Sequence, residues 1–139
     1  MKTKQRPLSV LVWLRLIRVV QKVSRAATEP MQNADLSGPQ LDLLATVNTA
    51  EGMTQQQLAD QLHVTKGNVT QLIDKLEKKG LLKRQKEGRI SKIFLTAQGT
   101  NLVARLLPDH DRFITEQFTG LTLEEQQQLL ALLRKIDHS

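Results

Sequence analysis

Residues 54–95 constrain the fold of this 139-residue chain more than any other segment. Thr54 and Gln57 form a capping box, which predicts the start of a short helix. Thr65 predicts the N-cap of a second helix, whose apolar residues recur at the three- and four-residue spacing of one helix face. The connection at residues 63–65 is short enough to force a sharp angle between the two helices.

Two short strands are predicted after the second helix, at residues 82–86 and 91–95. A turn over residues 87–90 joins them, and Gly88 in that turn is free to take a positive φ. The order is therefore helix, tight turn, helix, strand, short turn, strand. This order predicts a winged helix-turn-helix, in which the β-hairpin is the wing.

Long helices are predicted on both sides of this segment. A first helix over residues 8–27 has one stripe of basic residues, and apolar side chains cover the rest of its surface. Such a wide apolar face exceeds what a small domain buries alone, which favours a partner subunit on one side. Residues 29–36 are predicted to form a loop. Ser37 and Pro39 then predict the start of a helix that ends near Asn48.

After the hairpin, Thr96 is predicted to cap a long helix that Pro108 kinks or interrupts. Thr122 and Glu125 form another capping box, and a final helix with a leucine-rich face follows. We therefore expect a mainly α fold with a small β-hairpin wing, flanked by N- and C-terminal dimerisation helices. The parts of this one compact chain are residues 1–36 (N-terminal dimerisation helix and loop), 37–96 (winged helix-turn-helix) and 97–139 (C-terminal dimerisation helices).

The distribution of charge matters more than the formal net charge of +6. Residues 1–28 carry +7, residues 29–61 carry −5 and residues 62–92 carry +6. Basic blocks of this kind attract phosphates. Aromatic side chains are few, with one Trp, three Phe and no Tyr. Because proteins that bind single strands usually stack the bases on aromatic rings, double-stranded DNA is the expected partner.

Several classes of protein are disfavoured by what the sequence lacks. The absence of Cys excludes a disulfide framework, a thiol switch and a zinc site with Cys ligands, and it fits a reducing cytoplasm. The three His residues are far apart, so no metal or other cofactor is expected, although a metal site assembled from distant segments stays open. No phosphate-binding glycine loop or nucleophilic serine motif indicates an enzyme. Arg15 and Arg18 interrupt the apolar run at residues 8–20, so neither secretion nor membrane insertion is expected.

The second helix of the predicted motif has a polar face suited to reading DNA. Lys66, Asn68 and Gln71 are expected on the side opposite the apolar residues, where they can reach base edges and phosphates. Gly67 near the helix start allows a close backbone approach, and Arg89 lies at or beside the turn of the basic hairpin. The candidate DNA-binding residues are Thr54, Gln55, Thr65, Lys66, Gly67, Asn68, Thr70, Gln71, Lys75, Arg84, Lys86, Arg89, Ser91 and Lys92.

A resemblance to the MarR family of bacterial winged-helix regulators is carried by the run TQQQLADQLHVTKGNVTQLIDKLEKKGLLKR, followed by FLTAQG. It extends over nearly the whole chain, since the flanking helices also fit the family's pattern. The resemblance implies a transcriptional repressor that binds a pseudo-palindromic operator as a homodimer. It also implies that the helix at residues 66–79 enters the major groove and that the hairpin reaches the minor groove. A small aromatic or anionic effector is expected in a crevice between the dimer helices and the winged unit.

The wing departs from the family in length and in one residue. Members usually have an Asp-x-Arg there, in which the acid steadies an arginine that enters the minor groove, and Glu87 and Arg89 stand at these positions. The hairpin is also shorter than is usual.

Two other hypotheses stay open: a winged-helix dimer that contacts another protein instead of DNA, and nonspecific architectural DNA binding. Basic residues on both helix and hairpin favour DNA over a protein partner, and the uncharged polar residues Asn68, Thr70 and Gln71 favour sequence-specific reading.

Overall fold

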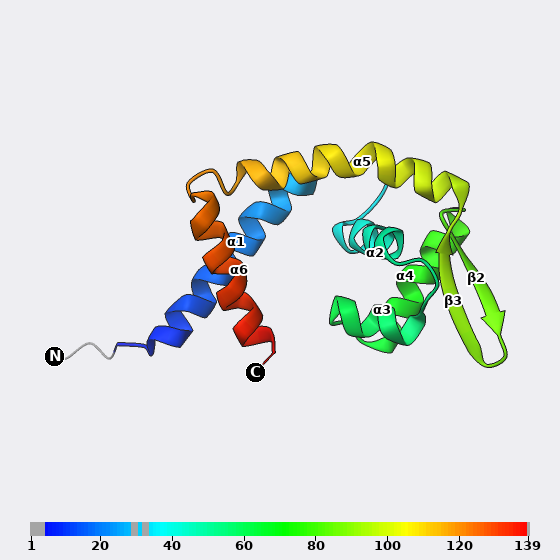
Figure 1. Ribbon diagram of the computed structural model, residues 1–139, viewed down its shortest axis with the longest axis horizontal. Coiled ribbons are helices and arrows are strands. Elements are labelled where there is room, and N and C mark those ends of the chain that lie inside the picture. The colour runs from blue at the N-terminus through cyan, green and yellow to red at the C-terminus, as the bar shows by residue number, and fades with distance from the viewer. Residues whose placement is uncertain (1–4, 29–30, 32–33, 139) are drawn as a thin grey trace. The chain divides into compact units, whose positions relative to one another are not determined.

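The computed structural model describes residues 5–28, 31 and 34–138 (Figure 1). In chain order its elements are α1 (Leu8–Thr28), α2 (Gly38–Thr49), β1 (Met53–Thr54), α3 (Gln55–Leu62), α4 (Lys66–Lys78), β2 (Leu82–Glu87), β3 (Ile90–Leu95), α5 (Ala97–Glu116) and α6 (Leu123–Asp137). The chain divides into two compact units. The terminal unit comprises residues 1–27 and 111–139, and the central unit comprises residues 28–110. The mainly α fold with a small hairpin wing is confirmed.

Side-chain caps begin the helices where the sequence predicts them. Thr54, Thr65 and Thr122 each accept a hydrogen bond from the backbone N–H three residues later, at 3.1 Å in every case. Ser37 caps α2 in the same way, and Gln40 completes a capping box there by accepting from the Ser37 N–H at 3.0 Å. Such caps satisfy backbone donors that have no partner within the helix.

The sheet of the central unit is antiparallel with strand order β1-β3-β2. Glu87 pairs with Ile90, so Gly88 and Arg89 form a two-residue turn, which confirms the predicted turn over residues 87–90. Gly88 has φ +63°, a conformation that favours glycine. The sequence does not predict β1, because a strand of two residues is too short to show alternation.

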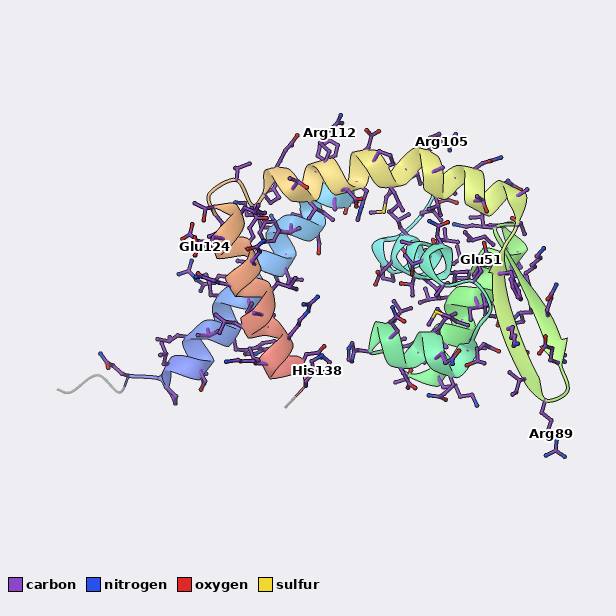
Figure 2. All side chains as sticks on the ribbon, viewed as in Figure 1. Glu51, Arg89, Arg105, Arg112, Glu124 and His138 are labelled. Atoms are coloured by element: carbon purple, nitrogen blue, oxygen red, sulfur yellow. The ribbon has the colours of Figure 1, made fainter. Side chains whose placement is uncertain are left out.

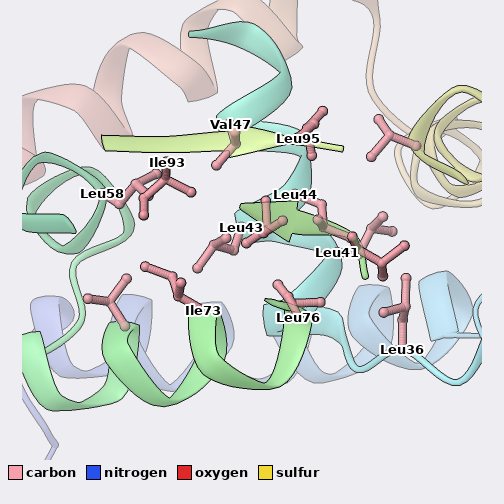
Figure 3. Packing of buried hydrophobic residues seen from close by; sticks show 14 of the residues in the cluster. Leu36, Leu41, Leu43, Leu44, Val47, Leu58, Ile73, Leu76, Ile93 and Leu95 are labelled. Atoms are coloured by element: carbon pink, nitrogen blue, oxygen red, sulfur yellow. The ribbon is translucent and has the colours of Figure 1, made fainter. Parts of the chain in front are cut away.

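The core of the central unit joins α2, α3 and α4 to the sheet. Figure 3 shows Ile73 of α4 directed toward Leu43 of α2. The side chains that are at most 1% exposed are Leu41, Leu43, Leu44, Val47, Leu58, Val69, Ile73, Leu76, Ile93 and Val103. Full burial of one such side chain contributes about 1.5–3 kcal/mol. This packing fixes the position of α4 relative to the sheet.

A tight joint connects the start of α5 to the base of the hairpin. The Thr96 hydroxyl donates to the Gly80 carbonyl at 2.6 Å and accepts from the Gly99 N–H at 3.0 Å. The Thr96 N–H donates to the Leu81 carbonyl at 3.1 Å. A Cβ placed on Gly99 would lie only 2.1 Å from the Leu81 carbonyl oxygen. The first turn of α5 therefore lies so close to the backbone of Leu81, the residue before β2, that only glycine fits at position 99.

Of the two expected effects of Pro108, a kink or an interruption, the interruption is wrong, because α5 is continuous through this residue. Pro108 lacks the N–H that would bond to the Ala104 carbonyl. Both residues are exposed, so water can take that bond, and the helix tolerates the proline. The helix ends at Glu116, so Phe118 lies beyond it.

The helices of the terminal unit leave much apolar surface in solvent. Trp13 in α1 is 59% exposed and Leu132 in α6 is 56% exposed. The other exposed large apolar residues of these helices are Leu8, Leu11, Val12, Val19, Val20, Leu123, Leu130, Leu133 and Ile136.

No described helix is long and apolar enough to cross a membrane. Residues 29–30 and 32–33 of the predicted loop, and Lys2 and Lys4 of the basic N-terminal block, lie outside the described residues.

Candidate nucleic-acid interface

The turn between α3 and α4 fixes the angle of the helix-turn-helix. His63 has a left-handed backbone with φ +54°, which ends α3. The Val64 N–H then donates to the Ala59 carbonyl at 3.1 Å, and Thr65 caps α4. Val69, at the first turn of α4, is fully buried. As a result, one face of α4 packs on the core and the opposite face lies in solvent.

The exposed face of α4 carries the polar residues that the sequence places there. Lys66, Gly67, Asn68, Gln71 and Lys75 are all exposed. A Cβ at Gly67 would have nothing within 4 Å, so this part of the helix is open to close approach. An amide such as that of Gln71 can pair bidentately with adenine, and the lysines can contact phosphate or guanine. The face has the chemistry of a helix that reads the major groove.

Thr70 and Gln55 are half-buried and contact each other across the two helices. The Thr70 hydroxyl donates to the Lys66 carbonyl at 2.8 Å, and the Gln55 amide donates to that hydroxyl oxygen at 3.4 Å. The first of these bonds lies within α4, and the second connects α3 to α4 beside the exposed face. The cap residues Thr54 and Thr65 use their hydroxyl oxygens as acceptors, so each retains a hydrogen that can be donated to a phosphate.

The strand register sorts the predicted wing residues onto two faces. Cross-strand partners share a face, and the face that holds Arg84 opposite buried Ile93 packs toward α4. Lys86 and Ser91 are opposite each other on this same face, nearer the turn. Lys92 is opposite Gln85 and lies on the other face. The structure thus groups Lys86 and Ser91 with α4, and it separates Lys92 from them.

Arg84 does not project freely into solvent. Its guanidinium donates to the Asp74 carboxylate at 2.5 Å and to the Glu77 carboxylate at 2.7 Å, and its side chain is 21% exposed. Sequence reasoning missed the part played by Asp74 and Glu77. Their three-residue spacing places them on one side of α4, but several basic residues follow them, and the pattern does not indicate which one pairs.

The tip of the wing is a single arginine beside a glycine. Figure 2 shows Arg89 at the outer end of the hairpin, pointing away from the strands. The carboxylate of Glu87 forms an ion pair with Lys92, at 3.0 Å, in place of the expected pairing with Arg89. The register explains this pairing, because Glu87 and Lys92 are diagonal neighbours on one face while Arg89 lies in the turn. Ile90 after the turn is also exposed.

Among the described residues, no group of three or more His, Asp or Glu side chains is arranged to hold a metal ion. The two capped helices, the exposed polar face of α4 and the basic hairpin define a winged helix-turn-helix protein. The chain belongs to the MarR family, which it matches over residues 36–88.

Relatives and solved structures agree with this assignment. An HTH-type transcriptional regulator of Bacillus cereus is 33% identical over 120 residues, covering 86% of this chain and 82% of the relative. The regulator YkoM of Bacillus subtilis is 31% identical over 121 residues, covering 85% and 79%. A cysteine-to-serine mutant of MarR from E. coli, solved with operator DNA, has a TM-score of 0.82 at 26% identity and covers 94% of this chain and 99% of that one. BpsR of Bordetella bronchiseptica shares the fold, with a TM-score of 0.87 at 20% identity and coverage of 98% and 99%.

Proposed function

We propose that this chain is a cytoplasmic transcriptional repressor that binds a pseudo-palindromic operator in duplex DNA as a homodimer and is released by a small aromatic or anionic effector. One observation carries the proposal: α4 presents exposed lysines and amides beside a hairpin that ends in an exposed arginine. A protein-binding adaptor has no need of positive charge on both elements. The similarity to E. coli MarR bound to operator DNA supports the same conclusion.

The contacts divide by chemistry. In the proposed complex α4 enters the major groove, where Asn68 and Gln71 read base edges. Lys66, Lys75 and Lys86 contact phosphates, which carry affinity but little sequence information. Arg89 enters the minor groove, where a narrow groove concentrates negative potential. Specificity then comes mainly from α4, and the wing adds a preference for groove shape.

The homodimer is inferred from the exposed apolar surface of the terminal unit. Trp13, Val20, Leu132 and Ile136 are more than half exposed, whereas monomeric proteins rarely leave large contiguous apolar patches in water. A hollow of about 320 Å³ is lined by Ile114, Thr115, Phe118, Gln126, Leu129, Leu130 and Leu133, and a second copy can fill it. Twofold symmetry would place two α4 helices about 34 Å apart, which suits a pseudo-palindromic site.

Effector release is inferred by similarity. The DNA binding of BpsR is regulated by 6-hydroxynicotinic acid, a small aromatic acid. A compound of this class would lower the affinity for the operator if it bound the DNA-free dimer more tightly than the DNA-bound dimer. At saturation, the fold-decrease in operator affinity equals the ratio of the compound's two affinities. Titration of small aromatic acids into the protein–operator complex tests this part of the proposal.

The experiment for DNA binding is the selection of bound fragments from a genomic pool, followed by gel shifts. The best site is compared with a scrambled duplex of equal length and composition at about 150 mM salt. We expect at least about a hundredfold preference for the selected site, since specific binding commonly exceeds nonspecific binding by ~10³ or more. Equal affinity for both duplexes would indicate architectural binding. Failure to bind either duplex would indicate a protein-interaction module.

A further inference from the structure

Arg84 connects the wing to the proposed recognition helix through two carboxylates. Nη2 donates to Oδ1 of Asp74 and Nη1 donates to Oε1 of Glu77, at 2.5 and 2.7 Å. The two acids are three residues apart on α4, so a planar guanidinium can reach both at once. Charge-assisted hydrogen bonds between a guanidinium and a carboxylate are roughly twice as strong as neutral ones. The contact joins the middle of β2 to the second half of α4.

We propose that Arg84 is a positioning residue for DNA binding, which holds the wing at a fixed place beside α4 and makes no phosphate contact itself. The proposal rests on the proposed function, because it gives Arg84 a task only in a protein that places both α4 and the wing on DNA. The sequence alone assigned Arg84 to the set of direct DNA contacts. Its partners and its 21% exposure assign it to the support of that set.

Electrostatics argue against a phosphate contact by the same guanidinium. To reach a phosphate, Arg84 would have to leave Asp74 and Glu77, whose side chains are 51% and 41% exposed. Two unneutralised carboxylates would then stand on the helix that approaches a polyanion, and like charges at this range repel. We call the contact of Arg84 with Asp74 and Glu77 the Arg84 clasp. It supports DNA binding in two ways, because it fixes the wing and neutralises two carboxylates on α4.

The hairpin needs such a support because a two-stranded ribbon is only marginally stable by itself. Leu82 and Ile93 are buried at its base, but the residues from Gln85 to Ile90, at the end of β2, in the turn and at the start of β3, are exposed. At a rise of about 3.3 Å per residue, the turn lies roughly 20 Å from Leu82 and roughly 13 Å from Arg84. A rotation of about 10° at the base would displace the tip by roughly 3 Å, enough to lose a hydrogen bond.

A measurement without DNA tests the clasp itself. The chain has no Cys, so Gln56→Cys in α3 and Gln85→Cys in the wing accept spin labels at these two positions only. Pulsed dipolar spectroscopy is run on labelled protein diluted with excess unlabelled protein, so that only distances within one subunit are seen. We expect Arg84→Gln to broaden or shift the distance distribution, and Lys83→Gln to leave it unchanged. Lys83 is the matched control, because it is an exposed cation one position earlier on the other face of the hairpin. An unchanged distribution in Arg84→Gln overturns the proposal.

A double-mutant cycle on the selected operator tests the role in binding. If Arg84 acts through the position of the wing, Arg84→Gln lowers affinity at least tenfold in the wild type but less than threefold when Arg89→Ala has already removed the tip contact. Independent phosphate contacts would give additive losses, and this result overturns the proposal. So does an Arg84→Gln variant that binds as well as wild type. If the wild-type protein binds no DNA, the proposed function is refuted, and so is the role of the clasp in binding. The spin-label measurement then still decides whether the clasp holds the wing in place.

Discussion

Gly99→Ala probes the joint at which α5 leaves the hairpin. The added Cβ would lie 2.1 Å from the Leu81 carbonyl oxygen and 3.0 Å from its carbonyl carbon. A carbon and a carbonyl oxygen in contact normally lie about 3.3 Å apart or more, so α5 and the backbone of Leu81 would have to separate by roughly 1 Å. Both partners belong to the backbone, and no side chain can rotate away. The joint must therefore move as a whole or be lost.

The expected cost follows from two opposing terms. Overpacking of a dense interior costs about 1–3 kcal/mol, with the upper end expected for a backbone clash, whereas alanine in place of glycine in a helix gains at most about 1 kcal/mol. We expect Gly99→Ala to lower the free energy of unfolding by about 2 kcal/mol and Tm by roughly 8 °C. Urea and thermal unfolding, followed by circular dichroism at equal protein concentration, measure both quantities.

Gly38→Ala is the matched control for this substitution. Gly38 lies at the start of α2, and a Cβ there would have nothing within 4 Å. The same chemical change at this open site should leave stability unchanged or raise it by under about 1 kcal/mol. If Gly99→Ala is as stable as Gly38→Ala, the close approach of α5 to the Leu81 backbone is not present in the folded protein.

Three further predictions concern the dimer and the DNA contacts. Replacing Leu132 and Leu133 together by Asp should dissociate or unfold the homodimer, and light scattering that still gave an intact dimer would contradict the role assigned to α6. Gln71→Ala should reduce the favourable free energy of binding to the best site by roughly 1–3 kcal/mol and relax the preference at one base pair. Lys86→Ala should lower the affinity for all sequences alike and reduce the slope of log affinity against log salt concentration by about one per contact. An equal loss of specificity in both variants would contradict this division of roles. Arg89→Ala should lower affinity at least tenfold, about 1.4 kcal/mol, most strongly at sites with A·T-rich flanks, with Tm unchanged; unaltered binding would show that the wing does not reach the groove.

Local signals in the sequence predict most of the fold because they act over short distances. A capping box needs only a Thr and an acceptor three residues later, and the chain uses both Thr54 and Thr122 in this way. The two-residue turn at Gly88 follows from its spacing and from the glycine itself. The interruption predicted at Pro108 fails because a missing hydrogen bond on an exposed face costs too little to end a helix.

The roles of individual wing residues could not be predicted in the same way, because they depend on strand register and on tertiary partners. A basic residue at position 84, 86 or 92 looks alike in the sequence. The register places Arg84 and Lys86 on the face toward α4 and Lys92 on the other face. Ion pairs then distinguish the basic residues further, because Arg84 pairs with Asp74 and Glu77, and Lys92 pairs with Glu87.

A wing that ends in a two-residue turn need not bind DNA weakly. Its strands run without a break to a two-residue turn, so the strand register fixes the base of the Arg89 side chain, and the Thr96 joint and the Arg84 clasp fix the strands in turn. A longer loop would reach further into a groove, but each residue ordered on binding costs about 1–2 kcal/mol of conformational entropy. A preorganised tip avoids that cost, so a shallow contact can equal a deeper contact made by a mobile loop. The length of the hairpin therefore does not by itself set the affinity for DNA. Residues inserted between Gly88 and Arg89 should extend the contact along the groove and yet weaken binding.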